Sequence, residues 1–158
     1  MRALSLPPVH RLHELAPLAL RLGVGLVFFV HGWQKLTGGP SGFAGMLTGL
    51  GVGAPGVLAW LVTIAELVGG ALLLIGLLTR LATLPLIGTM IGAIVLVKAD
   101  LGIIAPPDAP MAGAELDIAL LAGLVALLLL GPGRVSVDHV VGVEQDPVDR
   151  RDPVVTGR

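Results

Sequence analysis

Four long apolar stretches, separated by short segments rich in Gly, Pro and charged residues, dominate the chain. Each approaches the roughly 20 residues that an α-helix needs to cross a bilayer. The polar residues within them are isolated and form no continuous face, unlike those of an amphipathic helix in a soluble domain. The pattern predicts an all-α, polytopic membrane protein with a bundle of four transmembrane helices, over residues 16–36, 55–78, 80–99 and 114–131.

The segments between and beyond these stretches complete the expected organisation. Residues 37–54 are Gly-rich and are expected to connect the first two helices, whereas Thr79-Arg80 leaves room only for a tight antiparallel hairpin. The membrane domain then covers residues 16–138. Residues 1–15 are expected to form a cytoplasmic or interfacial segment, and residues 139–158 a disordered polar tail.

Composition supports lipid as the solvent. Hydrophobic residues make up 54% of the chain and charged residues 13%, against about 25% charged in a typical soluble domain. The net charge of -1, without a basic run, argues against nucleic-acid binding. The chain has no cysteine, which excludes disulfides, thiol chemistry and Cys-ligated metal centres.

The basic residues predict an orientation in the membrane. Lys35 and Lys98 fall on one side of the predicted bundle, and the arginines at 2, 11, 21, 80, 134, 150 and 151 fall on the other. The positive-inside rule therefore places both termini in the cytoplasm. Trp33 and Trp60 then lie toward the outer leaflet, as interfacial aromatic residues do.

Ionisable residues of all four predicted helices fall in the outer half of the bundle: His31, Lys35, Glu66, Lys98, Glu115 and Asp117. Glu66 is the most informative of them, because it lies roughly 16 Å along its helix from Pro55, near the bilayer midplane. A carboxylate there costs about 2.5–3.5 kcal/mol, so it should face the bundle and find a partner. His31 or Lys35 is the expected partner. Such a pair serves a functional site, or it only fixes helix packing.

Alternatives remain open for the other members. His31 is a proton-transfer group, a hydrogen-bond donor between helices, or one ligand of a metal site formed with Glu66 and Glu115. A haem with two histidine ligands is not expected, because no second histidine falls within a predicted span. Lys35 and Lys98 are expected to reach the interface with their ammonium groups. Because Glu115 and Asp117 point in different directions on a helix, only one faces the bundle well, and Glu115 is the one expected to do so.

Several residues have expected structural roles. Arg21 extends to the cytoplasmic interface or pairs with Asp138. Gly69 and the Gly88-x-x-x-Gly92 motif are expected to allow close backbone approach, within the chain or between two copies. Pro85 is expected to kink the third helix.

These short motifs together resemble the DoxX-like family of small four-helix bacterial membrane proteins. The matching pieces are "HGWQK" at 31–35, "AELVGGALLLIGLLTR" at 65–80, "GAEL" at 113–116 and "GPGRVSVD" at 131–138, with Arg21 and Gly25 before them. The resemblance implies an inner-membrane protein linked to redox chemistry, with quinone contact and soluble oxidoreductase or oxidant-defence partners. Carried over residue by residue, its motif positions are Arg21, His31, Gly32, Lys35, Glu66, Gly69, Glu115, Arg134 and Asp138. The Pro-rich loop at 100–112 and the acidic tail depart from the family pattern.

Three functional hypotheses follow. The first is a quinone-reactive membrane subunit, with His31 and Glu66 as catalytic candidates and Trp33, Lys35, Lys98 and Glu115 as ligand-binding ones. It has no intrinsic cofactor motif, so a partner must supply electrons, and quinone is the expected ligand. The second is a non-catalytic anchor for a soluble partner. The third is a transporter of a small solute or protons, for which four short helices are few unless the chain forms a homo-oligomer. Whether the chain is an enzyme is left open.

Overall fold

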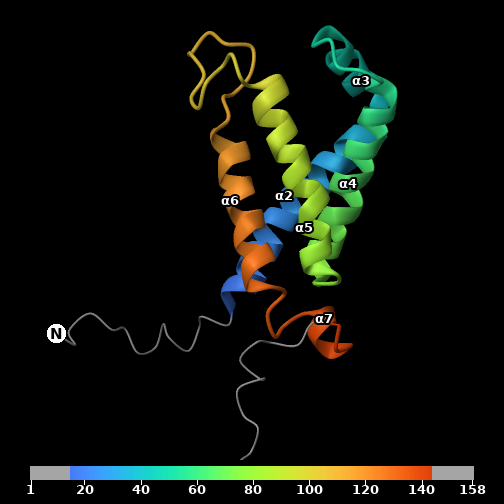
Figure 1. Ribbon diagram of the computed structural model, residues 1–158, viewed down its shortest axis with the longest axis vertical. Helices are drawn as coiled ribbons and strands as arrows, with labels where there is room; N and C mark the ends of the chain where they lie inside the picture. The colour runs from blue at the N-terminus through green and yellow to red at the C-terminus, as the bar shows by residue number, and fades with distance from the viewer. Residues whose placement is uncertain (1–14, 144–158) are drawn as a thin grey trace, which may run out of the picture.

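The computed structural model describes residues 15–143, whose regular elements are all helical (Figure 1). The expected class, an all-α membrane protein, is therefore confirmed. The elements are α2 (Ala16–Gly38), α3 (Pro40–Gly49), α4 (Pro55–Ile75), α5 (Thr79–Gly92), the π-helix η2 (Ala93–Val97), α6 (Glu115–Leu130) and α7 (Val137–Val140). The expected segment 1–15, except its last residue, and the tail from 144 on lie outside the described residues, whereas residues 139 and 140 close α7.

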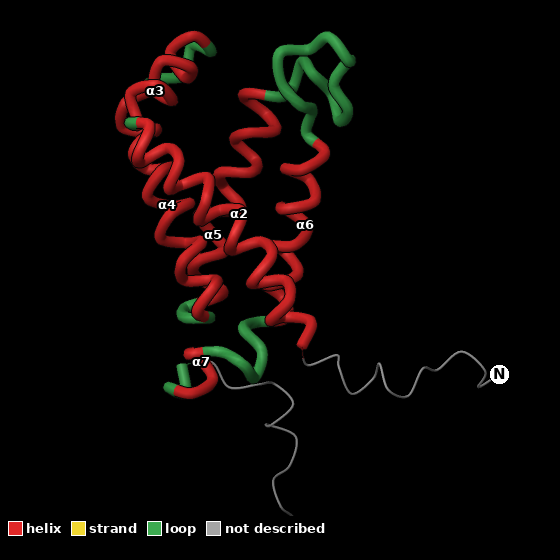
Figure 2. Tube along the Cα trace, turned by 180° about the vertical axis from the view of Figure 1, so that it is seen from behind, coloured by secondary structure: helices red, strands yellow, loops and turns green. Residues whose placement is uncertain are grey.

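Three helical segments within the described range are long and apolar enough to cross a membrane: Ala16–Gly38, Pro55–Ile75 and Thr79–Val97. The fourth expected span, α6, has 16 residues and is about 24 Å long, which is shorter than a typical span. It nevertheless runs beside α5 within the bundle, and α7 lies beneath (Figures 1 and 2). A large share of the apolar surface faces outward, including Val57, Leu81 and Leu129, as expected of helices solvated by lipid.

One helix was missed from the sequence. The residues at 37–54, expected to connect two spans, contain the ten-residue helix α3, which packs against α4. Pro40 opens α3, because proline at the first helical position has a suitable φ and its missing N–H needs no partner. Glycines at three positions lower the helix propensity of this segment. Burial of Leu47, only 3% exposed, shows that tertiary packing overrides that propensity.

Glycine allows α2 and α4 to pack closely, and theirs is the most extensive contact between helices in the part of the chain that the structure describes. A Cβ on Gly32 would collide with the backbone of Leu67, and one on Gly70 with the backbone of Phe29. In lipid, close van der Waals packing of this kind holds helices together, because burial of apolar groups gains little there. Gly69 similarly lies against the side chain of Leu86, joining α4 to α5.

The expectation of close packing at Gly88 and Gly92 was wrong within the chain. A Cβ on either residue would meet nothing within 4 Å. Both glycines instead face an open pocket, described below. Pro85 lies inside α5, which continues past it to Gly92 before the backbone changes to the π-helical η2. The third predicted span at 80–99 is thus two helical segments of different geometry.

A polar cluster at the α7 end of the bundle ties the chain together. Arg21 is 1% exposed and does not extend to an interface; it donates from Nη1 to Pro132 O at 2.9 Å and from Nη2 to Val135 O at 2.6 Å. The loop after α6, which also contains Arg134, is thereby held under α2. Arg21 and Asp138 lie in the same cluster and interact electrostatically, but Asp138 accepts its hydrogen bonds from Leu78 and Thr79.

Asp138, fully buried, fastens the tight α4–α5 hairpin. Its Oδ1 accepts from Leu78 N at 2.6 Å, and its Oδ2 accepts from Thr79 N at 2.9 Å. These N–H groups begin α5 and have no partner inside the helix. Leu78 has φ 50°, a left-handed conformation that a leucine adopts only when the surroundings impose it. The buried carboxylate therefore holds the hairpin in a strained turn.

Candidate functional site

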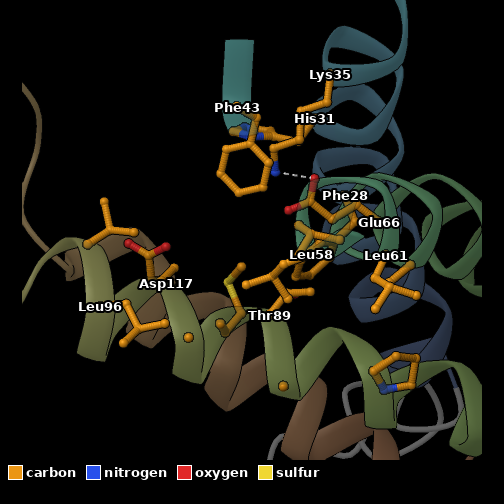
Figure 3. Close-up of a pocket in the computed structure, with 18 of the residues that line it drawn as sticks. Phe28, His31, Lys35, Phe43, Leu58, Leu61, Glu66, Thr89, Leu96 and Asp117 are labelled. Carbon is orange, nitrogen blue, oxygen red and sulfur yellow. Dashed lines mark hydrogen bonds and ion pairs between the residues drawn. The ribbon is translucent and has the colours of Figure 1, made fainter. Parts of the chain in front are cut away.

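A pocket with a volume of about 680 Å³ opens in the half of the bundle away from α7. One wall comes from α2, α3 and α4, and the other from α5, η2 and α6 (Figure 3). Its lining is mainly aliphatic and aromatic, with Phe28, Phe43, Leu47 and Met90 among the contributors. Most of the ionisable residues predicted to gather in the outer half of the bundle also line it. Ligand pockets of this kind combine an apolar lining with a few convergent polar groups.

Lys35 and Glu66 form an ion pair on the first wall. Lys35 Nζ lies 2.5 Å from Glu66 Oε2, and the side chains are 22% and 4% exposed. The lysine ammonium also lies 4.8 Å from the centre of the Phe43 ring, a cation–π contact with α3. The closed pair satisfies the nearly buried carboxylate inside an apolar bundle. It also leaves a donor and an acceptor at the pocket wall.

Gly32 explains why these two side chains meet. Its Cα lies against the backbone at Glu66 and Leu67, where no side chain would fit. Lys35 is one turn further along α2, on the same face as Gly32. The close approach of the two helices therefore brings the lysine to the carboxylate. The glycine of the "HGWQK" stretch is a positioning residue for the pair.

His31 lines the same pocket, but it is not the partner of Glu66. His31 is exposed, and within residues 15–143 no hydrogen bond joins it to Glu66. Lys35, the other expected candidate, takes that place. Figure 3 shows His31 next to Lys35 and Phe43 at the pocket. His31 is thus positioned beside the ion pair, with its imidazole available to a ligand.

A second ion pair, between Lys98 and Asp117, belongs to the other wall. Lys98 Nζ lies 2.9 Å from Asp117 Oδ2 and donates to Gly113 O at 2.7 Å. The 2.9 Å approach lacks hydrogen-bond geometry, so the buried Oδ2 has Coulombic stabilisation but accepts no hydrogen bond within the described residues. Lys98, expected to reach the interface, is instead held between η2 and α6.

The expected choice between Glu115 and Asp117 was therefore wrong. Asp117 is 9% exposed and lines the pocket, whereas Glu115 is exposed and outside the lining. Glu115 is the first residue of α6, and its backbone N–H donates to Ile103 O of the preceding loop. That loop sets where α6 begins and hence how it is rotated. The sequence pattern alone carried no such information.

Two further predictions concern residues outside the pocket. Trp33 is 53% exposed, is not part of the lining, and stacks on Phe29 with ring centroids 6.5 Å apart. This position fits an interfacial anchor better than a ligand contact. Within residues 15–143 no three His, Cys, Asp or Glu residues gather as a possible metal site, so His31, Glu66 and Glu115 are not brought together as ligands.

The pocket also contains residues that sequence reasoning missed. Phe43, Met46 and Leu47 come from α3, which was expected to be a connection. Leu47, Thr48 and Phe43 lie between glycines, and the Gly-rich composition obscured the helical spacing of Phe43 and Leu47. That i, i+4 spacing of large apolar residues was the available signal.

The architecture and pocket define a small helical membrane protein with a polar-ended, mainly apolar cavity. The DoxX family model matches residues 16–99, more than half of the chain. The chain belongs to the DoxX family, and the expected family is confirmed. The match includes both residues of the Lys35–Glu66 pair.

Two curated relatives cover most of the chain. An "Uncharacterized membrane protein" of Mycobacterium tuberculosis is 38% identical over 139 residues, which cover 81% of this chain and 84% of the relative. "Putative oxidoreductase CatD" of Bacillus subtilis is 35% identical over 130 residues, which cover 81% of this chain and 88% of the relative. No solved structure matches the chain.

Proposed function

We propose that this protein is the quinone-binding membrane subunit of a redox system. The observation that carries the proposal is the mainly apolar pocket with the Lys35–Glu66 pair on its wall. Its volume of about 680 Å³ lies within the range of about 300–1,000 Å³ typical of small-molecule sites. Quinones are lipid-soluble, and their carbonyl oxygens need hydrogen-bond donors. The name of the Bacillus subtilis relative as an oxidoreductase is compatible with this assignment.

The pocket residues suit the proton chemistry of such a ligand. Reduction of a quinone to its quinol takes up two electrons and two protons. Lys35 can donate a hydrogen bond to a carbonyl oxygen, and His31, beside it, can pass protons from the surface. Glu66 holds the lysine in place and can accept the hydroxyl proton of the quinol in the reverse direction. The two electrons come from a soluble redox protein bound to the membrane subunit.

We further infer the orientation in a bacterial inner membrane. Arg21, Arg80 and Arg134 belong to the α7 end, near the hairpin and the loop after α6, and Lys35 and Lys98 to the opposite end. The positive-inside rule then directs the α7 end to the cytoplasm and the pocket toward the outer leaflet. The short α6 completes the crossing as a fourth span, so that both termini are cytoplasmic.

The test is purification of the chain from native membranes in mild detergent, with mass spectrometry of extracted quinones and co-purifying proteins. We expect stoichiometric quinone and a redox protein, and loss of the quinone in the Lys35→Met variant. Gln34→Met, an exposed neighbour outside the pocket lining, is the matched control and should retain quinone. A folded preparation with a soluble partner but no quinone would instead support the anchor hypothesis. Solute or proton flux in liposomes of the chain alone would support transport.

A further inference from the structure

The pocket has two charged poles on separate walls. The first pole is Lys35 with Glu66, from α2 and α4; the second is Lys98 with Asp117, from the end of η2 and from α6. Figure 3 shows Asp117 across the pocket from the Lys35–Glu66 pair. All four residues line the same cavity, and the surface between the poles is mainly apolar. A ligand that fills the cavity therefore meets a polar contact at each end.

We propose that the second pole, Lys98 with Asp117, binds the distal oxygen of a ligand that has one oxygen at each end of a flat ring. This inference rests on the proposed function and specifies its substrate class as para-quinones and their quinols. In such rings two oxygens lie on opposite sides of an apolar body, which matches two poles separated by an apolar lining. A single-oxygen ring would leave one pole without a contact.

The chemistry of each pole suits both redox forms. Each pole combines an ammonium donor with a carboxylate acceptor. A quinone carbonyl accepts a hydrogen bond from the lysine, and a quinol hydroxyl donates one to the carboxylate. Asp117 is part of the pocket lining and its side chain is 12% exposed, so its carboxylate can accept from a ligand hydroxyl while Oδ2 stays paired with Lys98 Nζ at 2.9 Å.

A brace between η2 and α6 is the competing role for this pole, because Lys98 also donates to Gly113 O before α6. A brace would affect every ligand equally. A contact with the distal oxygen would affect only ligands that have this oxygen. The two roles therefore separate in a comparison of ligands rather than in a comparison of stabilities.

The experiment measures equilibrium binding of 1,4-naphthoquinone and of 1-tetralone, which has one carbonyl, to the full-length chain in lipid nanodiscs. We expect the wild type to bind 1,4-naphthoquinone about tenfold more tightly, the value of one hydrogen bond to a charged group. The Lys98→Met/Asp117→Leu variant removes the pole without leaving a lone charge. It should lose this preference and bind 1-tetralone as the wild type does, which also shows that it is folded.

The possible results distinguish the inference from the proposed function. Equal wild-type affinity for the two rings would overturn the inference whatever the variant does, while quinone binding itself would stand. A variant that keeps the tenfold preference, or weakens both ligands by the same factor, would assign Lys98 and Asp117 to a brace. Failure of the wild type to bind either ring would overturn the proposed function and the inference together.

Discussion

Lys35, in the last turn of α2, neutralises Glu66 in the middle of α4, with 2.5 Å between Nζ and Oε2. The two partners differ in burial: the carboxylate is 4% exposed and the lysine 22% exposed. Lys35 is in the last turn of its helix, from which a long side chain can reach the headgroup region when it is unpaired. Glu66 has no such route. The cost of breaking the pair should therefore depend on which partner is removed.

Lys35→Met should destabilise the fold more than Glu66→Gln. Removing the lysine leaves a buried carboxylate alone, at a cost of about 3–5 kcal/mol, whereas removing the carboxylate leaves a lysine that can move to the interface. The double variant Lys35→Met/Glu66→Leu should recover much of the loss. Reversible unfolding in bicelles measures all three. Equal losses for the two single variants would contradict the asymmetric burial.

Gly32→Ala should disrupt the contact between α2 and α4. The new Cβ would overlap the backbone of Leu67, and backbone cannot move aside cheaply, so we expect a loss of about 2 kcal/mol or more in unfolding free energy. Gly23→Ala on the same helix is the matched control, because nothing lies within 4 Å of its Cβ position. It should be neutral or stabilising by up to about 1 kcal/mol. Similar losses at both positions would argue against the close approach.

Asp138→Ala should loosen the hairpin between α4 and α5. It leaves the N–H groups of Leu78 and Thr79 without a hydrogen-bond acceptor, at about 1–3 kcal/mol each, and so about 2–6 kcal/mol in total. Asp138→Asn keeps one acceptor and should lose less. Asp108→Ala, in the exposed loop before α6, is the control and should have no effect. Thermal unfolding in detergent ranks the three. An Asp138→Ala variant as stable as the control would show that the carboxylate does not stabilise the hairpin.

Labelling from either side of the membrane tests whether the short α6 crosses the bilayer. The chain has no cysteine, so single cysteines can be introduced in a clean background. In intact cells an impermeant thiol reagent should label Asp108→Cys, before α6, and should reach Val140→Cys, in α7, only after the membrane is permeabilised. Labelling of both positions from the same side would mean that α6 does not cross the bilayer.

Sequence reasoning predicted the helical membrane class because apolar runs of sufficient length are themselves the signal. It also singled out Glu66, since a carboxylate within an apolar run needs a partner, and it named Lys35 as one candidate. Lys35 rather than His31 pairs with Glu66 because of how α2 packs against α4 at Gly32. That contact involves residues far apart in the chain.

The remaining errors share a cause. Asp117 rather than Glu115 lines the pocket, because the loop at 100–113 determines the rotation of α6. Gly88 and Gly92 face a pocket rather than a helix, and α3 lies on the opposite wall of that pocket. The sequence did not predict α3, because its glycines lower its helix propensity. Small residues in a sequence indicate that space is needed, and only the fold shows whether a helix or a ligand uses it.

The most direct test of the account is photocrosslinking with a quinone that carries an azide on its ring, followed by peptide mapping of the chain in native membranes. We predict adducts on the pocket peptides with Phe43, Leu47 and Met90, suppressed by excess unlabelled quinone and by Lys35→Met. Adducts confined to outward-facing residues such as Trp60 and Leu129, unaffected by competitor, would contradict a quinone site in this pocket.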